Sequence, residues 1–187
     1  MSTIGSRMMT AFRVNSDIKL KSEQSMNTAL AAKEEKIRNT DENMYTVLFV
    51  CTGNTCRSPM AEAVYNFYAK KLGLNARAVS AGLFASGAKL SAHAKTALVD
   101  AGFVDEDYEH MSTQIDEKLC ESADLIIGMT DSHAMHLIMN FPAYATKIRA
   151  LTKEIADPFG GYLVTYKETL VQIDSVIKEE FFSEYNI

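Results

Sequence analysis

The sequence lacks an apolar run that approaches the ~18–20 residues of a membrane-spanning helix, and it lacks an excess of positive charge. Its 187 residues carry a formal net charge of −5. This acidic balance argues against nucleic acids and anionic membranes, so we expect neither as a partner. An anion site must therefore be local, built from backbone dipoles and one or two arginines. The apolar content of 47% is ordinary for a soluble globular domain.

Cysteine is also scarce, with Cys51, Cys56 and Cys120 as the three examples. An odd number, with two members five residues apart, argues against a disulfide framework. The pattern favours a reducing compartment and a reactive thiol, so we expect a cytoplasmic protein. The chain contains no internal repeat and no low-complexity tract, and we expect a monomer.

Residues 1–43 differ in character from the rest. They are rich in Ser, Thr, Asn and Met with mixed charge and few branched apolar side chains, which predicts a polar, disordered N-terminal extension. Thr28–Arg38 has a helix-favouring composition but no wide apolar face. The early basic residues also fit a transit peptide, and Met44 is an alternative start codon. Residues 44–187 are predicted to form one compact domain.

From Met44 onward, strand and helix patterns alternate. Thr46–Val50 is short, continuous and apolar, which is typical of a buried parallel strand. This alternation predicts an α/β fold: a single doubly wound domain with a four-stranded parallel sheet flanked by helices. Ligands of such sheets bind at the carboxyl ends of the strands, where Cys51 lies. The predicted strands are 46–50, 76–80, 124–129 and 147–151, and the predicted helices are 59–72, 91–101, 116–122, 131–140 and 162–185.

A loop with the sequence Cys51-Thr52-Gly53-Asn54-Thr55-Cys56-Arg57-Ser58 joins the first strand to the first helix. Backbone N–H groups in such a loop point inward and the helix dipole adds positive charge, so its natural guest is a phosphate-like dianion. The same groups favour the ionised thiolate of Cys51, the expected nucleophile. The planar guanidinium of Arg57 can hold two phosphoryl oxygens at once.

The remaining loop residues suit the same purpose. Gly53 lets the backbone turn tightly, and Asn54 tolerates a left-handed conformation and can tie the loop down through its side chain. Ser58 can cap the helix or donate a hydrogen bond to the thiolate. The alternative is a buried structural cysteine before an ordinary capped helix. The preceding strand, the following helix and the Gly-Asn pair favour the anion site.

Phosphoryl transfer to the thiol also needs a general acid, because the leaving group must be protonated as it departs. Asp157 is the best candidate, since it follows the predicted fourth strand in a loop that ends in Gly160 and Gly161. The alternative for Asp157-Pro158 is an ordinary turn.

Two segments together resemble a known family. They are Val50–Glu62, which reads VCTGNTCRSPMAE, and Asp157–Gly161, which reads DPFGG. They resemble the low-molecular-weight protein tyrosine phosphatases and, within them, the bacterial protein arginine phosphatases most. The resemblance extends from Met44 to about Tyr185. It implies the fold of that family and a phosphatase that acts on a phosphorylated protein without a metal or a cofactor.

The resemblance also implies roles for the matching residues. Cys51 attacks phosphorus and forms a phospho-cysteine intermediate, while Arg57 and the loop amides bind the equatorial oxygens. Asp157 protonates the leaving group and then activates water, and Ser58 stabilises the departing thiolate. Asn54 shapes the loop.

Two supporting residues and one redox residue follow from the same resemblance. Ser80 and His110 would support Asn54, although a surface histidine is the alternative for His110. Cys56 would form a reversible disulfide with the catalytic cysteine, the alternative being a small packed residue. The resemblance gives no role to the remaining histidines, which are His93, His133 and His136.

The substrate residue depends on Thr55 and Phe159. In the family that this chain resembles, phosphotyrosine-specific members carry a branched apolar residue where this chain has Thr55. They also carry two aromatic residues after the Asp-Pro pair. Here Phe159 is followed by two glycines, and each missing aromatic contact is worth roughly 0.5–1.5 kcal/mol. Thr55 and the segment Ser80–Ser86 match the arginine-specific members. We therefore favour phosphoarginine, with phosphotyrosine as an alternative or additional substrate.

Two other functions use related loops. Arsenate reduction needs further cysteines near the end of the third strand, where this chain has Met129-Thr130-Asp131. A non-catalytic phosphate-binding module would be expected to lack the nucleophile or the acid, and both are present. We therefore expect an enzyme.

Overall fold

The computed structural model describes residues 44–185 and 187. Asn43–Ile187 form one compact unit, and the predicted extension over residues 1–43 lies outside the described residues. Every described helix is too short or too polar to cross a membrane.

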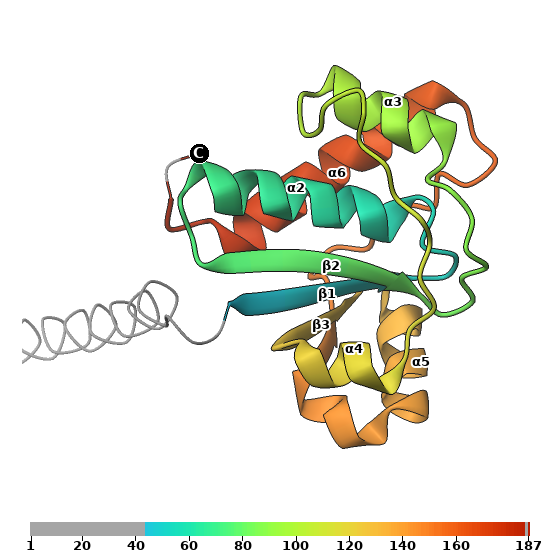
Figure 1. Cartoon of the computed structure of the whole chain (residues 1–187), viewed down its shortest axis with the longest axis vertical. Helices are drawn as coiled ribbons and strands as arrows, with labels where there is room; N and C mark the ends of the chain where they lie inside the picture. The colour runs from blue at the N-terminus through green and yellow to red at the C-terminus, as the bar shows by residue number, and fades with distance from the viewer. Residues whose placement is uncertain (1–43, 186) are drawn as a thin grey trace, which may run out of the picture. The chain divides into compact units, whose positions relative to one another are not determined.

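Four parallel strands form one sheet (Figure 1). They are β1 (Tyr45–Cys51), β2 (Ala76–Gly82), β3 (Leu125–Gly128) and β4 (Ile148–Ala150), in the order β2-β1-β3-β4. The chain passes from β1 to β2 on one side of it and then to β3 on the other side. The carboxyl end of β1 is therefore the switch point at which ligands of doubly wound sheets bind.

Helices cover both faces of the sheet (Figure 1). One face carries α2 (Arg57–Lys71), α3 (Ala92–Asp100) and α6 (Leu163–Phe181). The other face carries α4 (Glu117–Ser122) and α5 (Asp131–Asn140), followed by the 3-10 helix η1 (Pro142–Lys147). The predicted fold class is confirmed, and every predicted strand and helix has its counterpart.

Some element ends differ from the prediction. Helix α2 begins at Arg57 instead of Pro59, because the amide of Met60 already donates to the carbonyl of Cys56 at 3.1 Å. Pro59 lies in the first turn, where a missing N–H loses no helical hydrogen bond. The last helix ends at Phe181 instead of Tyr185. The short η1, which begins at Pro142 two residues after the end of α5, was not predicted.

The core explains why β1 is apolar along its whole length. Val47, Phe49 and Cys51 face the layer of α2, α3 and α6, while Leu48 and Val50 face the layer of α4 and α5. Both faces of β1 are buried, so the strand needs no alternation of polar and apolar residues.

Two glycines allow close approach at the strand ends that surround the site. A Cβ on Gly82 would lie 2.9 Å from the carbonyl oxygen of Thr52, and a Cβ on Gly128 would lie 2.5 Å from the amide of Ala134. The absence of a side chain therefore lets the loop after β1 and the start of α5 pack directly against β2 and β3.

Candidate active site

The predicted loop lies between β1 and α2, with the Cys51 thiol at its base. Cys51 is 3% exposed. Its Sγ accepts a hydrogen bond from the amide of Asn54 at 3.3 Å and lies 3.0 Å from the hydroxyl oxygen of Ser58. The loop therefore places a backbone donor and a hydroxyl on the sulfur, which is an environment suited to a thiolate.

Asn54 is the structural centre of the loop. It is fully buried and has a φ of 54°, the left-handed conformation that asparagine tolerates. Its side-chain nitrogen Nδ2 donates to the hydroxyls of Ser58 at 2.9 Å and Ser80 at 2.8 Å. Its side-chain oxygen accepts from the amide of Thr113 at 2.8 Å and lies 3.2 Å from Nε2 of His110. The structure thus places Ser80 and His110 in contact with Asn54.

Glu62 extends this network, and the sequence analysis gave it no role. The hydroxyl of Ser80 donates to Oε2 of Glu62 at 2.6 Å. Burial raises the pKa of Glu62, and the hydrogen bond from Ser80 partly offsets the increase. Its place one turn after Ser58 on α2 was the available signal, but helical spacing alone does not show which face of the helix is buried.

Arg57 and Asp157 meet across the mouth of the loop although they lie 100 residues apart. Nη2 of Arg57 is 2.7 Å from Oδ2 of Asp157, and their side chains are 7% and 51% exposed. The other carboxylate oxygen accepts from the amide of Phe159 at 3.2 Å. The predicted acid therefore borders the predicted phosphate site while remaining open to solvent. A dianion bound to the guanidinium of Arg57 would compete with the Asp157 carboxylate for it.

Cys56 is buried on the α6 side of the loop. Its Sγ lies 3.4 Å from the hydroxyl of Tyr166 and 3.6 Å from that of Thr55. Burial raises the pKa of the Cys56 thiol, and these two hydrogen bonds partly offset the increase. Cys51, Cys56 and Cys120 are all free thiols. The contact with Tyr166 was not predicted, because α6 begins far from the loop in sequence.

The two predicted specificity residues lie at the surface of the site. Thr55 is half-buried in the loop, and Phe159 is 77% exposed. Gly160, with a φ of 77°, turns the chain directly after Phe159. Phe159 is therefore the one aromatic side chain of residues 157–161, and Tyr162, which is 82% exposed, follows it before α6 begins.

His133 is a contact of the loop that the sequence analysis missed. It is 6% exposed, and its Nε2 lies 3.0 Å from the hydroxyl of Thr52. Burial, reinforced by the nearby Arg57, lowers the pKa of His133 to about 4. Its position five residues after the end of β3 could have identified it, had the order of the strands been known, because β3 adjoins β1.

The other histidines lie outside the loop. A ring nitrogen of His93 is 3.3 Å from the carbonyl of Gly161, and His136 packs edge-on against Phe84. Across residues 44–185 and 187, no three His, Cys, Asp or Glu side chains converge as metal ligands.

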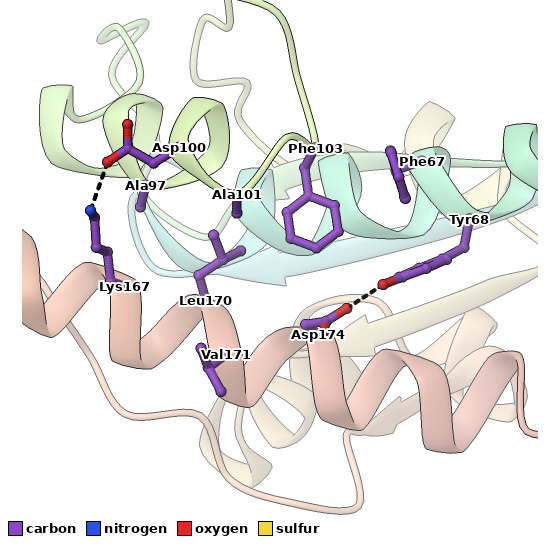
Figure 2. A pocket seen from close by; sticks show the side chains of 10 residues that line it. All are labelled: Phe67, Tyr68, Ala97, Asp100, Ala101, Phe103, Lys167, Leu170, Val171 and Asp174. Carbon is purple, nitrogen blue, oxygen red and sulfur yellow. Dashed lines mark hydrogen bonds and ion pairs between the residues drawn. The ribbon is translucent and has the colours of Figure 1, made fainter. Parts of the chain in front are cut away.

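A separate cleft of about 530 Å³ lies between α2, α3 and α6 (Figure 2). Phe67, Phe103 and Leu170 contribute to its apolar lining, and an ion pair from Lys167 to Asp100 at 2.6 Å bounds one side. None of the predicted site residues lines this cleft. This cleft is therefore distinct from the predicted site at the end of β1.

The fold and the loop define a class of protein, and comparison with known families identifies it. The family described as low molecular weight phosphotyrosine protein phosphatase matches residues 46–184. The chain belongs to this family, as the sequence predicted.

Individual relatives agree with this assignment. The protein-arginine-phosphatase of Bacillus subtilis (strain 168) is 38% identical over 141 residues, which cover 71% of this chain and 92% of the relative. The low molecular weight protein-tyrosine-phosphatase PtpB of Staphylococcus haemolyticus (strain JCSC1435) is 35% identical over 134 residues, covering 68% and 91%. A solved structure of the YwlE arginine phosphatase, a cysteine-to-serine mutant with a phosphorylated active site serine, has a TM-score of 0.66 and 34% identity over 74% of this chain and 98% of its own.

Proposed function

We propose that this chain is a cysteine-dependent protein phosphatase that hydrolyses phosphoarginine through a phospho-cysteine intermediate. One observation supports this most directly. The Cys51 sulfur lies at the switch point of the sheet with two hydrogen-bonding groups on it, while Arg57 and Asp157 meet at 2.7 Å beside the same loop. A nucleophile, an anion-binding guanidinium and an acid therefore share one loop mouth.

In the first step, the Cys51 thiolate attacks phosphorus and a phosphorus–sulfur bond forms. The bond from phosphorus to the leaving nitrogen breaks, and that nitrogen takes the proton of the Asp157 carboxyl. Arg57 and the amides of residues 52–58 hold the three equatorial oxygens, where charge develops. The rigidity that Asn54 gives the loop keeps these donors oriented before the substrate binds.

In the second step, a water molecule attacks the phospho-cysteine. The Asp157 carboxylate takes a proton from the water, and the phosphorus–sulfur bond breaks. Ser58 lies 3.0 Å from the sulfur, so its hydroxyl can stabilise the returning thiolate. Inorganic phosphate leaves, and both residues regain their starting protonation states.

The preference for phosphoarginine as the substrate is inferred from the side chains that border the site. Thr55 presents a small hydrogen-bonding side chain, and Phe159 is the one aromatic among residues 157–161. The Asp157 carboxylate, which already pairs with a guanidinium in the free protein, is suited to pair with that of the substrate. The similarity to the protein-arginine-phosphatase of Bacillus subtilis supports the same choice. Phosphotyrosine is the second candidate, supported by the similarity to PtpB.

Further proposals concern the setting of this activity. We infer that residues 44–187 form the catalytic domain, that it works as a monomer in the cytoplasm, and that nucleic acids and membranes are not its partners. The three free thiols support a reducing compartment. Oxidation to a disulfide between Cys51 and Cys56 would switch the enzyme off. Mass spectrometry after mild peroxide should then find this disulfide, and sulfonic acid at Cys51 with a free Cys56 would contradict it.

A direct test compares initial rates on two peptides of identical sequence that carry phosphoarginine or phosphotyrosine. We expect the larger kcat/KM for phosphoarginine. The Cys51→Ser variant is the control and should be inactive on both peptides while folding normally. Faster turnover of phosphotyrosine would select the second candidate, and an active Cys51→Ser variant would refute the nucleophile assignment.

A further inference from the structure

The side chain of His133 connects α5 to the loop that carries the nucleophile. Its Nε2 is 3.0 Å from Oγ1 of Thr52, and its Nδ1 is 2.6 Å from Oγ1 of Thr130. We propose that His133 is a positioning residue of the phosphate loop, which holds the Thr52 side chain, and with it the backbone next to Cys51, from the β3 side.

The loop needs such a contact because its other anchor acts from the opposite side. Asn54 is tied to Ser80 of β2 and to the Thr113 amide beyond it. Strand β2 adjoins β1 on one side and β3 adjoins it on the other. The contact between Thr52 and His133 therefore completes a clamp, with one anchor on each side of the loop.

The geometry at Thr130 explains how the imidazole is held. Thr130 caps α5, and its Oγ1 accepts from the amide of His133 at 3.3 Å. The same oxygen contacts Nδ1 of the ring and, at 2.8 Å, the hydroxyl of Ser132. Both ring nitrogens of His133 thus have a hydroxyl partner, which defines the orientation of the ring.

The charge state of the ring fits this role. A neutral imidazole has one donor and one acceptor nitrogen, and a hydroxyl can complement either. Burial and the Arg57 cation keep the pKa of His133 well below neutrality, with a smaller opposing effect from Asp157 and a reinforcing one from His136. The contact therefore persists in the neutral form throughout the physiological pH range.

Thr52 passes this restraint to the nucleophile. It follows Cys51 directly, and its carbonyl accepts from the amide of Phe84 at 2.8 Å. Its side chain is exposed apart from the contact with His133. When that contact is lost, the backbone between Cys51 and Gly53 can relax, and a displacement of ~1 Å at a reacting group costs up to ~100-fold in rate.

The test uses the full chain and four variants: Thr52→Val, Thr52→Ser, His133→Phe and the double variant Thr52→Val/His133→Phe. Matched controls are Thr96→Val, at an exposed threonine of α3, and His136→Gln, at an exposed histidine one turn along α5. The measurements are kcat and KM on an aryl phosphate, the inhibition constant of inorganic phosphate, the rate of Cys51 alkylation by iodoacetate, and the melting temperature.

We expect Thr52→Val to lower kcat/KM by about tenfold and to weaken phosphate binding with an unchanged melting temperature. Thr52→Ser keeps the hydroxyl and should stay within about twofold of the parent, and the double variant should be within about twofold of His133→Phe, because both substitutions remove the same contact. Both controls should match the parent.

Parental kcat/KM and phosphate binding in Thr52→Val would overturn the proposal, as would losses that multiply in the double variant. If His133→Phe does not fold, the pair of Thr52 variants decides alone. The turnover readout rests on the proposed function, whereas alkylation of Cys51 and its protection by phosphate do not. A parent without phosphatase activity but with altered alkylation in Thr52→Val would refute the function and leave the positioning role supported.

Discussion

At the scale of single residues, the site combines groups that the local sequence identifies with groups that only packing brings there. Cys51, Arg57 and Asp157 follow from motif and turn signals, and they lie together in the structure. No role was predicted for Glu62, His133 or Tyr166, yet each contacts a loop residue or its support. The predicted roles of the first group are the easiest to test by substitution.

Asp157→Ala should slow the hydrolysis of poor leaving groups most, because they need a proton as the bond breaks. We expect a loss of about 10²–10⁴-fold for an alkyl-substituted aryl phosphate and a much smaller one for a nitrophenyl ester. A series of aryl phosphates with graded leaving groups measures this dependence. Equal losses along the whole series would argue against the acid role.

Thr55→Ile should shift selectivity toward phosphotyrosine. The substitution removes a hydroxyl that can bond a guanidine and adds apolar surface for a phenyl ring, and each effect is worth about 1 kcal/mol. The ratio of kcat/KM for the matched phosphoarginine and phosphotyrosine peptides should fall by roughly fivefold or more. Thr55→Ser, which keeps the hydroxyl, is the control, and an unchanged ratio in Thr55→Ile would contradict this specificity role.

At the scale of secondary-structure elements, the site depends on how closely strand ends and helix starts approach. Strand β3 ends at Gly128, and α5 begins three residues later with its cap at Thr130. The absence of a side chain at Gly128 allows this tight turn, since a Cβ there would lie 2.5 Å from the backbone of Ala134. The position of His133 against the loop depends on the same turn.

Gly128→Ala should therefore destabilise the fold by about 2–4 kcal/mol, because backbone must move to admit the methyl group. Gly73→Ala is the matched comparison: Gly73 has a φ of 64° and no atom near its missing Cβ, so only backbone strain of about 1–2 kcal/mol applies. Urea denaturation of both variants measures the difference. A Gly128→Ala variant as stable as Gly73→Ala would show that α5 shifts without cost.

At the scale of the whole molecule, the burial of a neutral histidine makes the stability of the fold depend on pH. The pKa of His133 in the folded chain, about 4, lies below the value of 6.5 for a free histidine. As the pH falls, the unfolded chain therefore binds the proton first. The contribution of His133 to stability is complete above pH 6.5 and is lost between pH 6.5 and about 4.

The free energy of unfolding should accordingly fall by about 1–3 kcal/mol over this range because of His133 alone. Chemical denaturation at pH 7, 6, 5 and 4 measures the slope. His133→Gln should flatten it, and His136→Gln should not. Identical slopes in His133→Gln and the parent would contradict the link between burial and proton binding.

The catalytic domain should also work without the preceding residues. The family match covers residues 46–184, and Asn43–Ile187 form a compact unit of their own. A chain that begins at Met44 should keep its melting temperature and its kcat/KM within about twofold of the full chain. A tenfold loss in either quantity would show that residues 1–43 belong to the working enzyme.

The order of elements, the phosphate loop and the three catalytic candidates were determined by the sequence itself. Periodicity and turn residues act over a few positions, so the run from Thr46 to Pro59 carries its own strand, loop and helix start. The start of α2, the end of α6 and the short η1 were not predicted correctly, because local hydrogen bonding decides where these helices begin and end.

Only the tertiary structure decided which distant groups meet the loop. The ion pair from Arg57 to Asp157 spans 100 residues, and the contacts of Thr52 with His133 and of Cys56 with Tyr166 span 81 and 110. The order of the strands and the burial of each helix face bring these groups together. Neither property is encoded in the spacing of any one segment, because both arise from packing among all of them.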